Sequence, residues 1–75
     1  MNKHNDYRGL MKQANEELEK HGYALALTEP EEGCYSLEIR KDGKTVEVYA
    51  ENYYENELSD LVTDAWHHVN EKLNK

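Results

Sequence analysis

The dipeptide Asp42-Gly43 lies between two segments that alternate apolar and polar residues, and it limits the possible folds more than any other feature of the chain. An Asp-Gly pair favours a two-residue type I′ turn, because both central residues of that turn need a positive φ. The alternation on either side is typical of strands that bury one face. The sequence therefore predicts an antiparallel hairpin whose first strand is Cys34–Lys41.

The simplest register of this hairpin places two carboxylates opposite each other. Like charges in directly opposed positions cost roughly 0.2 to 1 kcal/mol, which Arg40, a diagonal neighbour of Glu47, would offset. Such a pair is expected on a face of the sheet that water reaches. The expected pairs are Ile39 with Val46, Leu37 with Val48, and Glu38 with Glu47.

Two further segments complete the expected sheet and begin the chain. "YALALT", Tyr23 to Thr28, alternates large with small residues and predicts a strand, which Pro30 and Gly33 then interrupt. Before it, apolar residues at helical spacing predict a helix over about residues 5–21. Gly22 is its candidate C-cap, and Asn5 or Asp6 is its candidate N-cap.

The C-terminal segment returns to helical spacing. Its start is open, because Asn52 with Glu55 resembles a capping box, whereas Asn56 as the cap would leave Tyr53 and Tyr54 in a linking turn. The apolar stripe of this second helix comprises Leu58, Leu61, Val62, Ala65, Trp66, Val69 and Leu73.

The order of elements is therefore α-β-β-β-α, an α+β fold in which residues 1–75 form a single small domain. Both helices need an apolar surface, so both are expected on one face of a three-stranded antiparallel meander. The other face is left to water. Its expected residues are Ala24, Ala26, Ser36, Glu38, Arg40, Thr45, Glu47 and Tyr49.

Charge and size narrow the possible functions. Sixteen acids against nine bases give a formal net charge of −7. Such a surface repels nucleic acid, whose binding depends on Lys and Arg, and attracts a basic protein partner. An equally simple interpretation is that the acids keep a bacterial-type protein soluble. At 75 residues the chain leaves little room for a deep catalytic cleft, and we expect no enzymatic activity.

The single cysteine, Cys34, excludes an intramolecular disulfide. The first residues, "MNKHNDYRGL", lack the apolar stretch of a signal peptide, and no apolar run approaches the ~18 residues of a membrane span. We therefore expect a cytoplasmic protein that does not enter membranes.

Two acidic surfaces are candidates for a binding site. The first is the open sheet face, where Glu38, Glu47 and Tyr49 would form an acidic patch with an aromatic ring. The second is the outer face of the last helix, with Glu57, Asp60, Asp64 and Glu71. A catalytic carboxylate pair is disfavoured, since a solvated sheet face does not separate the two pKa values as acid–base catalysis requires.

A metal site is the weaker interpretation of the same helix. In "DAWHHVNE", carboxylate and imidazole side chains at Asp64, His67, His68 and Glu71 follow at spacings that can ligate zinc. The site would be open to solvent, with no cysteine or third histidine nearby in sequence. We therefore expect solvated helix surface, no metal and no cofactor.

The order α-β-β-β-α resembles the double-stranded RNA-binding domain. That family uses a lysine-rich entry to its last helix to hold phosphates. Here the entry is "NYYENELSD", which carries Glu55, Glu57 and Asp60 and no base. The resemblance thus implies the fold, and RNA binding is not carried over.

The stretch "LEIRKDGKTVEVYAEN" with the helix after it is similar to one family of small phage-encoded anti-CRISPR proteins that inhibit Cas9 by mimicking DNA. Asp42 and Gly43 match the Asp-Gly turn with which that family contacts the PAM-reading region. Lys41, Lys44 and Thr45 depart from the polar or negative flanks of a mimic. The resemblance covers about the last half of the chain and implies inhibition of a nucleic-acid-binding enzyme.

The sequence therefore favours a small acidic protein-binding module of bacterial or phage type with a basic protein partner. A DNA-mimic inhibitor is the first alternative. A homodimer through the open sheet face, where Ala24 and Ala26 allow close approach, is the second.

Overall fold

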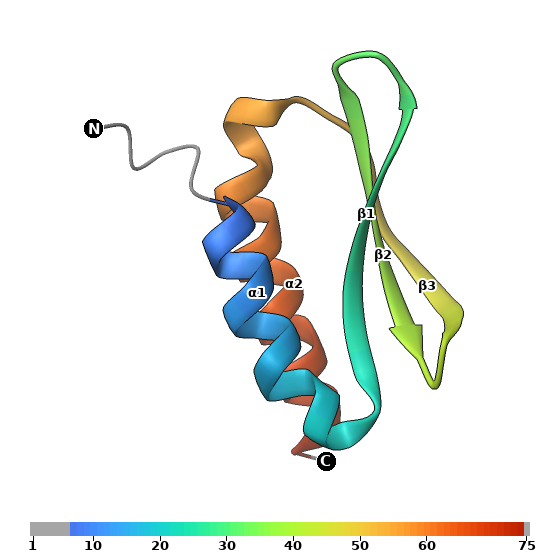
Figure 1. The fold of residues 1–75 in the computed structure, drawn as a ribbon, viewed down its shortest axis with the longest axis vertical. Coiled ribbons are helices and arrows are strands. Elements are labelled where there is room, and N and C mark those ends of the chain that lie inside the picture. The colour runs from blue at the N-terminus through green and yellow to red at the C-terminus, as the bar shows by residue number, and fades with distance from the viewer. Residues whose placement is uncertain (1–6, 75) are drawn as a thin grey trace.

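A computed structural model describes residues 7–74 and shows an α+β fold in the order α-β-β-β-α (Figure 1). Two short 3₁₀ segments, η2 and η3, adjoin the helices. The elements are α1 (Tyr7–Leu18), η2 (Glu19–His21), β1 (Tyr23–Glu31), β2 (Cys34–Lys41), β3 (Lys44–Tyr53), η3 (Glu55–Glu57) and α2 (Leu58–Leu73).

The first helix ends where the sequence predicts. Gly22 has φ +81° and donates its N–H to the Glu19 carbonyl at 3.0 Å, so it caps the helix in the left-handed conformation. The last turn before this cap is tightened into η2. The predicted N-caps, Asn5 and Asp6, lie outside the described residues.

The sheet has the order β1-β2-β3 with both neighbouring pairs antiparallel, as a meander requires. β1 is longer than predicted, because its pairing resumes between Glu31 and Cys34 after an irregularity that contains Pro30. Proline, which has no N–H to donate, is tolerated at such a point of an edge strand. In the turn that follows, Gly33 donates its N–H to the Glu29 carboxylate at 2.9 Å.

The predicted Asp-Gly turn is confirmed, with φ +53° at Asp42 and +84° at Gly43. The simple register beyond it is wrong. β3 departs from regular pairing with β2 at three places, the first between the pairs Arg40–Thr45 and Ile39–Glu47. A residue added to one strand turns the residues after it to the opposite face. The observed pairs are Ile39 with Glu47, Glu38 with Val48, and Leu37 with Ala50.

This change of register moves the valines of β3 out of the core. Val46 and Val48 were expected on the inner face, yet their exposed fractions are 57% and 50%. Ala50 does pack against the core, as predicted, because a second irregularity returns it to the position opposite Leu37.

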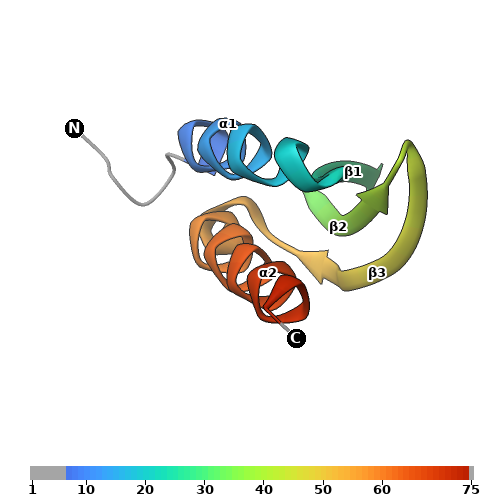
Figure 2. The same ribbon diagram turned by 90° about the horizontal axis from the view of Figure 1, so that it is seen from below.

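Both helices lie side by side on the same side of the sheet, as predicted (Figures 1 and 2). α2 contacts all three strands, whereas α1 contacts β1 and α2. Trp66 and Leu73 of the predicted stripe are half-buried at the margin of the core. The buried apolar residues are Tyr7, Ala14, Leu18, Leu25, Leu37, Ile39, Leu58, Leu61, Val62, Ala65 and Val69.

Asn15 of α1 covers the outer edge of β1. Its side-chain amide donates to the Leu25 carbonyl at 3.2 Å, and its side-chain oxygen accepts the Leu25 N–H at 2.7 Å. These are the two groups that a further strand would use, so the helix satisfies the edge at this residue.

The start of α2 follows neither predicted cap. Asn52 has φ +64° within β3, and Asn56 lies within η3. The turn is closed instead by Tyr54 and Glu57. The Glu57 N–H donates to the Tyr54 carbonyl at 2.9 Å, and the Tyr54 N–H donates to the Glu57 carboxylate at 3.1 Å.

None of the helices in residues 7–74 is both long enough and apolar enough to cross a membrane.

Candidate functional site

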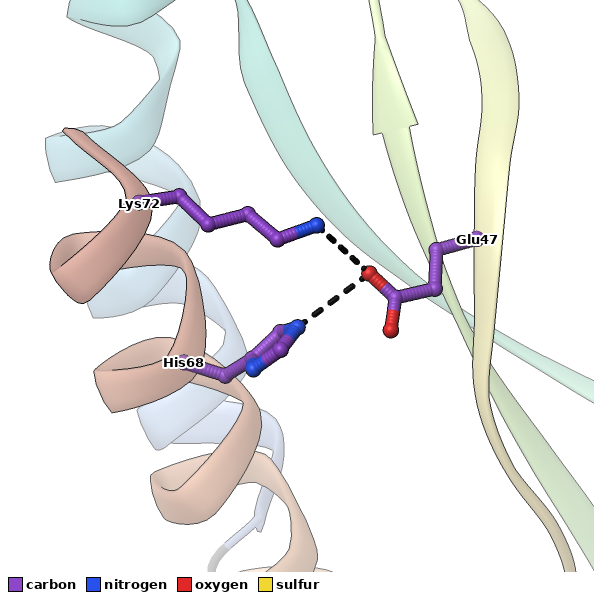
Figure 3. Close-up of polar contacts among 3 residues, drawn as sticks. All are labelled: Glu47, His68 and Lys72. Atoms are coloured by element: carbon purple, nitrogen blue, oxygen red, sulfur yellow. Dashed lines mark hydrogen bonds and ion pairs between the residues drawn. The ribbon is translucent and has the colours of Figure 1, made fainter. Parts of the chain in front are cut away.

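The carboxylate of Glu47 joins the outer strand of the sheet to the last helix. Its Oε1 accepts a hydrogen bond from Lys72 Nζ at 2.9 Å and lies 3.2 Å from His68 Nε2 (Figure 3). His68 and Lys72 are four residues apart and so share one flank of α2. The irregularity after Thr45 turns Glu47 toward this flank. We call Glu47, Tyr49, His68 and Lys72 the β3–α2 flank.

The pKa of Glu47 is lowered by these contacts. The hydrogen bond from Lys72 contributes most and that from His68 second, and together they outweigh the opposite effect of desolvation. The side chain remains 33% exposed, so water screens part of the attraction. Glu47 therefore stays ionised at a more acidic pH than an isolated glutamate does.

Tyr49 lies beside His68, with ring centroids 5.0 Å apart and planes tilted by 45°. Its placement on the open sheet face is therefore wrong, because it packs against the core on the side of α2. The pKa of Tyr49 is raised, first by desolvation and then by the negative charge of Asp64. Its phenol group thus remains protonated and able to donate a hydrogen bond.

Glu38 does lie opposite an exposed residue, but that residue is Val48 rather than Glu47. The predicted opposition of two carboxylates is therefore wrong. Arg40 Nη2 lies 3.3 Å from Glu38 Oε1, and the Thr45 hydroxyl donates to the same oxygen at 3.0 Å. Only 22% of the side chain is exposed, and both contacts to this oxygen come from within the protein.

Three exposed acids follow the outer face of α2, and we call Asp60, Asp64 and Glu71 the α2 acidic row. None of them forms an ion pair within residues 7–74. Lys72, the helix's own lysine, is directed at Glu47 instead. Glu57, the fourth predicted acid, is exposed but uses its carboxylate to close the turn before α2.

The predicted site residues therefore lie at separate places in the structure. Glu47 and Tyr49 meet at the β3–α2 flank, and Asp64 is close enough to act on Tyr49. Glu38 is separated from them by the sheet. Sequence reasoning missed His68 and Lys72 as partners of Glu47, and their four-residue spacing was the available signal.

The possible zinc ligands of α2 do not converge. Within residues 7–74, no group of three or more His, Cys, Asp or Glu side chains is arranged to hold a metal ion. His68 is directed at Glu47, and His67 is exposed. Cys34 begins β2 opposite Glu31 and is half-buried.

A second feature lies between the two helices. A hollow of about 350 Å³ that is open to solvent is lined by Gln13, Glu16 and Glu17 of α1, Lys20 of η2 and Trp66 of α2. We call it the Trp66 hollow.

No family model, no curated protein and no solved structure matches the chain.

Proposed function

We propose that the protein is a non-enzymatic acidic binding module that recognises a basic protein partner through the outer face of α2. The observation that carries this proposal is the α2 acidic row, whose three carboxylates are exposed and form no ion pair within residues 7–74. Unmatched carboxylates on one helix face attract a positively charged surface and orient its approach.

The open sheet face contributes less to this proposal. Arg40 and Thr45 engage Glu38, and Glu47 is turned toward α2, so neither charge is free to attract a partner. The net charge of −7 supports acidic recognition in general, and the α2 acidic row gathers three carboxylates without ion pairs within residues 7–74 on one helix face. A DNA-mimic inhibitor is the form of this function in which the partner is a nucleic-acid-binding enzyme.

A homodimer through the open sheet face is the second candidate. Val46 and Val48 are exposed there, with exposed fractions of 57% and 50%, and they are large apolar side chains on a surface that no helix covers. Light scattering distinguishes the candidates, because a dimer has twice the monomer mass and Val48→Asp would restore the monomer.

The test compares proteins captured from a bacterial lysate by three immobilised chains. These are the wild type, the variant Asp60→Asn/Asp64→Asn/Glu71→Gln, and the matched control Glu19→Gln/Glu32→Gln/Glu51→Gln. Both variants lose three negative charges, but the control loses them at exposed acids elsewhere. We expect a partner that the wild type and control retain, that the first variant loses, and that elutes as salt is raised. Equal capture by all three chains, or none by the wild type, contradicts the proposal.

A further inference from the structure

The Trp66 hollow combines an aromatic ring with carboxylates from a different helix. Its residues from α1 and the following η2 are three and four positions apart, so they share the face that adjoins α2. Trp66 is half-buried and forms the aromatic part of the lining. This combination differs from a row of surface acids because it offers a ring and a volume of about 350 Å³ together with charge.

The charges in the hollow are only partly matched. Glu17 Oε2 lies 3.6 Å from Lys20 Nζ, but the two side chains are 63% and 71% exposed, and such a pair is weak. Glu16 is exposed and forms no ion pair within residues 7–74. Two carboxylates against one ammonium leave the hollow with a net negative charge.

We propose that the Trp66 hollow binds the guanidinium group of an arginine side chain on a protein partner. A guanidinium is planar, so it stacks on an indole ring while its edge donates hydrogen bonds to a carboxylate. A lysine ammonium is attracted by the same charges but lacks the flat surface and the forked donors. The hollow lies on the flank of α2 that faces α1, away from the β3–α2 flank, and the inference goes beyond the α2 acidic row.

Trp66 reports directly on this site because it is the only tryptophan in the chain. The probes are Nα-acetylarginine amide and Nα-acetylcitrulline amide, which have the same shape but differ in charge. Trp66 fluorescence, excited selectively over tyrosine, is followed at constant ionic strength as each probe is added. We expect a saturable change with the arginine probe and none with the citrulline probe. The same response to both, or a response that never saturates, overturns the proposal.

Variants that change the charge of the hollow in opposite directions provide a second test. Glu16→Gln/Glu17→Gln should weaken binding of the arginine probe about fivefold, because it removes both attracting charges. Lys20→Gln should strengthen binding, since it removes the ammonium that competes for Glu17. The matched control Glu32→Gln/Glu51→Gln changes the net charge equally away from the hollow and should leave the affinity within about twofold. If Glu16→Gln/Glu17→Gln and this control have the same affinity, the hollow is not the site.

Binding of the arginine probe to the Trp66 hollow should not require the α2 acidic row. In the variant Asp60→Asn/Asp64→Asn/Glu71→Gln, the arginine probe should still produce its change in Trp66 fluorescence. If that change is lost in this variant and kept in Glu16→Gln/Glu17→Gln, arginine binds the acidic row, and the inference about the hollow is wrong while the proposed function stands.

Discussion

The carboxylate of Glu47 holds α2 to the outermost strand of the sheet, since it accepts from both Lys72 and His68. Glu47→Gln removes the charge and keeps the shape. The contacts are charge-assisted but a third exposed, so we expect a loss of about 1 kcal/mol in the free energy of unfolding at pH 7. Urea denaturation measures it. Glu51→Gln, an exposed acid on the same strand, is the control and should be near neutral; equal midpoints for the two variants would contradict the interpretation.

The lowered pKa of Glu47 predicts that the free energy of unfolding depends on pH. The pKa of Glu47 is lower in the folded protein than in the unfolded chain, so its stabilising contribution is fully present above the unfolded pKa of about 4.3. It is lost as the pH falls through the folded value. The difference in unfolding free energy between wild type and Glu47→Gln should therefore shrink below about pH 5. A difference that stays constant on acidification would show that the charge of Glu47 is not its source.

Two features of the structure favour glycine at position 22. Its φ is +81°, and a Cβ added there would lie 2.8 Å from Asp42 Oδ1 in the β2–β3 turn. Gly33 has the same φ with nothing within 4 Å of an added Cβ, so it isolates the backbone effect. We expect Gly33→Ala to cost about 1 kcal/mol and Gly22→Ala to cost more, both measured by thermal unfolding. Equal costs would show that the Asp42 side chain moves aside freely.

At the scale of elements, Asn15 joins α1 to the outer edge of β1 through two hydrogen bonds to Leu25. Asn15→Ala should destabilise the protein by roughly 1 to 3 kcal/mol, because it leaves both backbone groups without their partner. Hydrogen exchange of the Leu25 amide should also accelerate. Asn70→Ala on the exposed face of α2 makes the same change in helix propensity without such bonds, and should not destabilise. Unchanged exchange at Leu25 would argue against the role of Asn15.

The elements themselves could be predicted from local pattern, but their pairing could not. Helical spacing, alternation and the Asp-Gly turn each act over a few residues, and each predicted element is present in the structure. The register of β3 instead brings Glu47 to partners that lie 21 and 25 residues further along the chain. Nothing near Val46 signals the irregularity that turns Glu47 toward α2. For that reason Glu47 faces α2 and does not join Glu38 on the open sheet face as predicted. Asp60 and Asp64, in contrast, are exposed on the helix face that the sequence predicts.

At the scale of the whole molecule, one core lies between the helices and the inner face of the sheet. For a chain of this length the free energy of unfolding should be on the order of 4 to 11 kcal/mol. Val69 is fully buried in that core, while Val48 is half exposed. Val69→Thr should cost roughly 1 to 3 kcal/mol by burying a hydroxyl, and Val48→Thr about 0.5 kcal/mol or less. Chemical denaturation of the two variants checks both values, and similar costs would favour the regular register that places Val48 inside.

The irregular pairing of β3 also bears on how the molecule behaves among its own copies. β3 is an edge strand of ten residues, a length that commonly invites another strand to extend the sheet. Each of its three irregularities interrupts the even spacing of backbone donors and acceptors that an incoming strand would need. On the opposite edge, Asn15 occupies the same groups at Leu25. Both edges of the sheet thus hinder the addition of another strand, and we expect the protein to resist fibril formation although Val46 and Val48 are exposed.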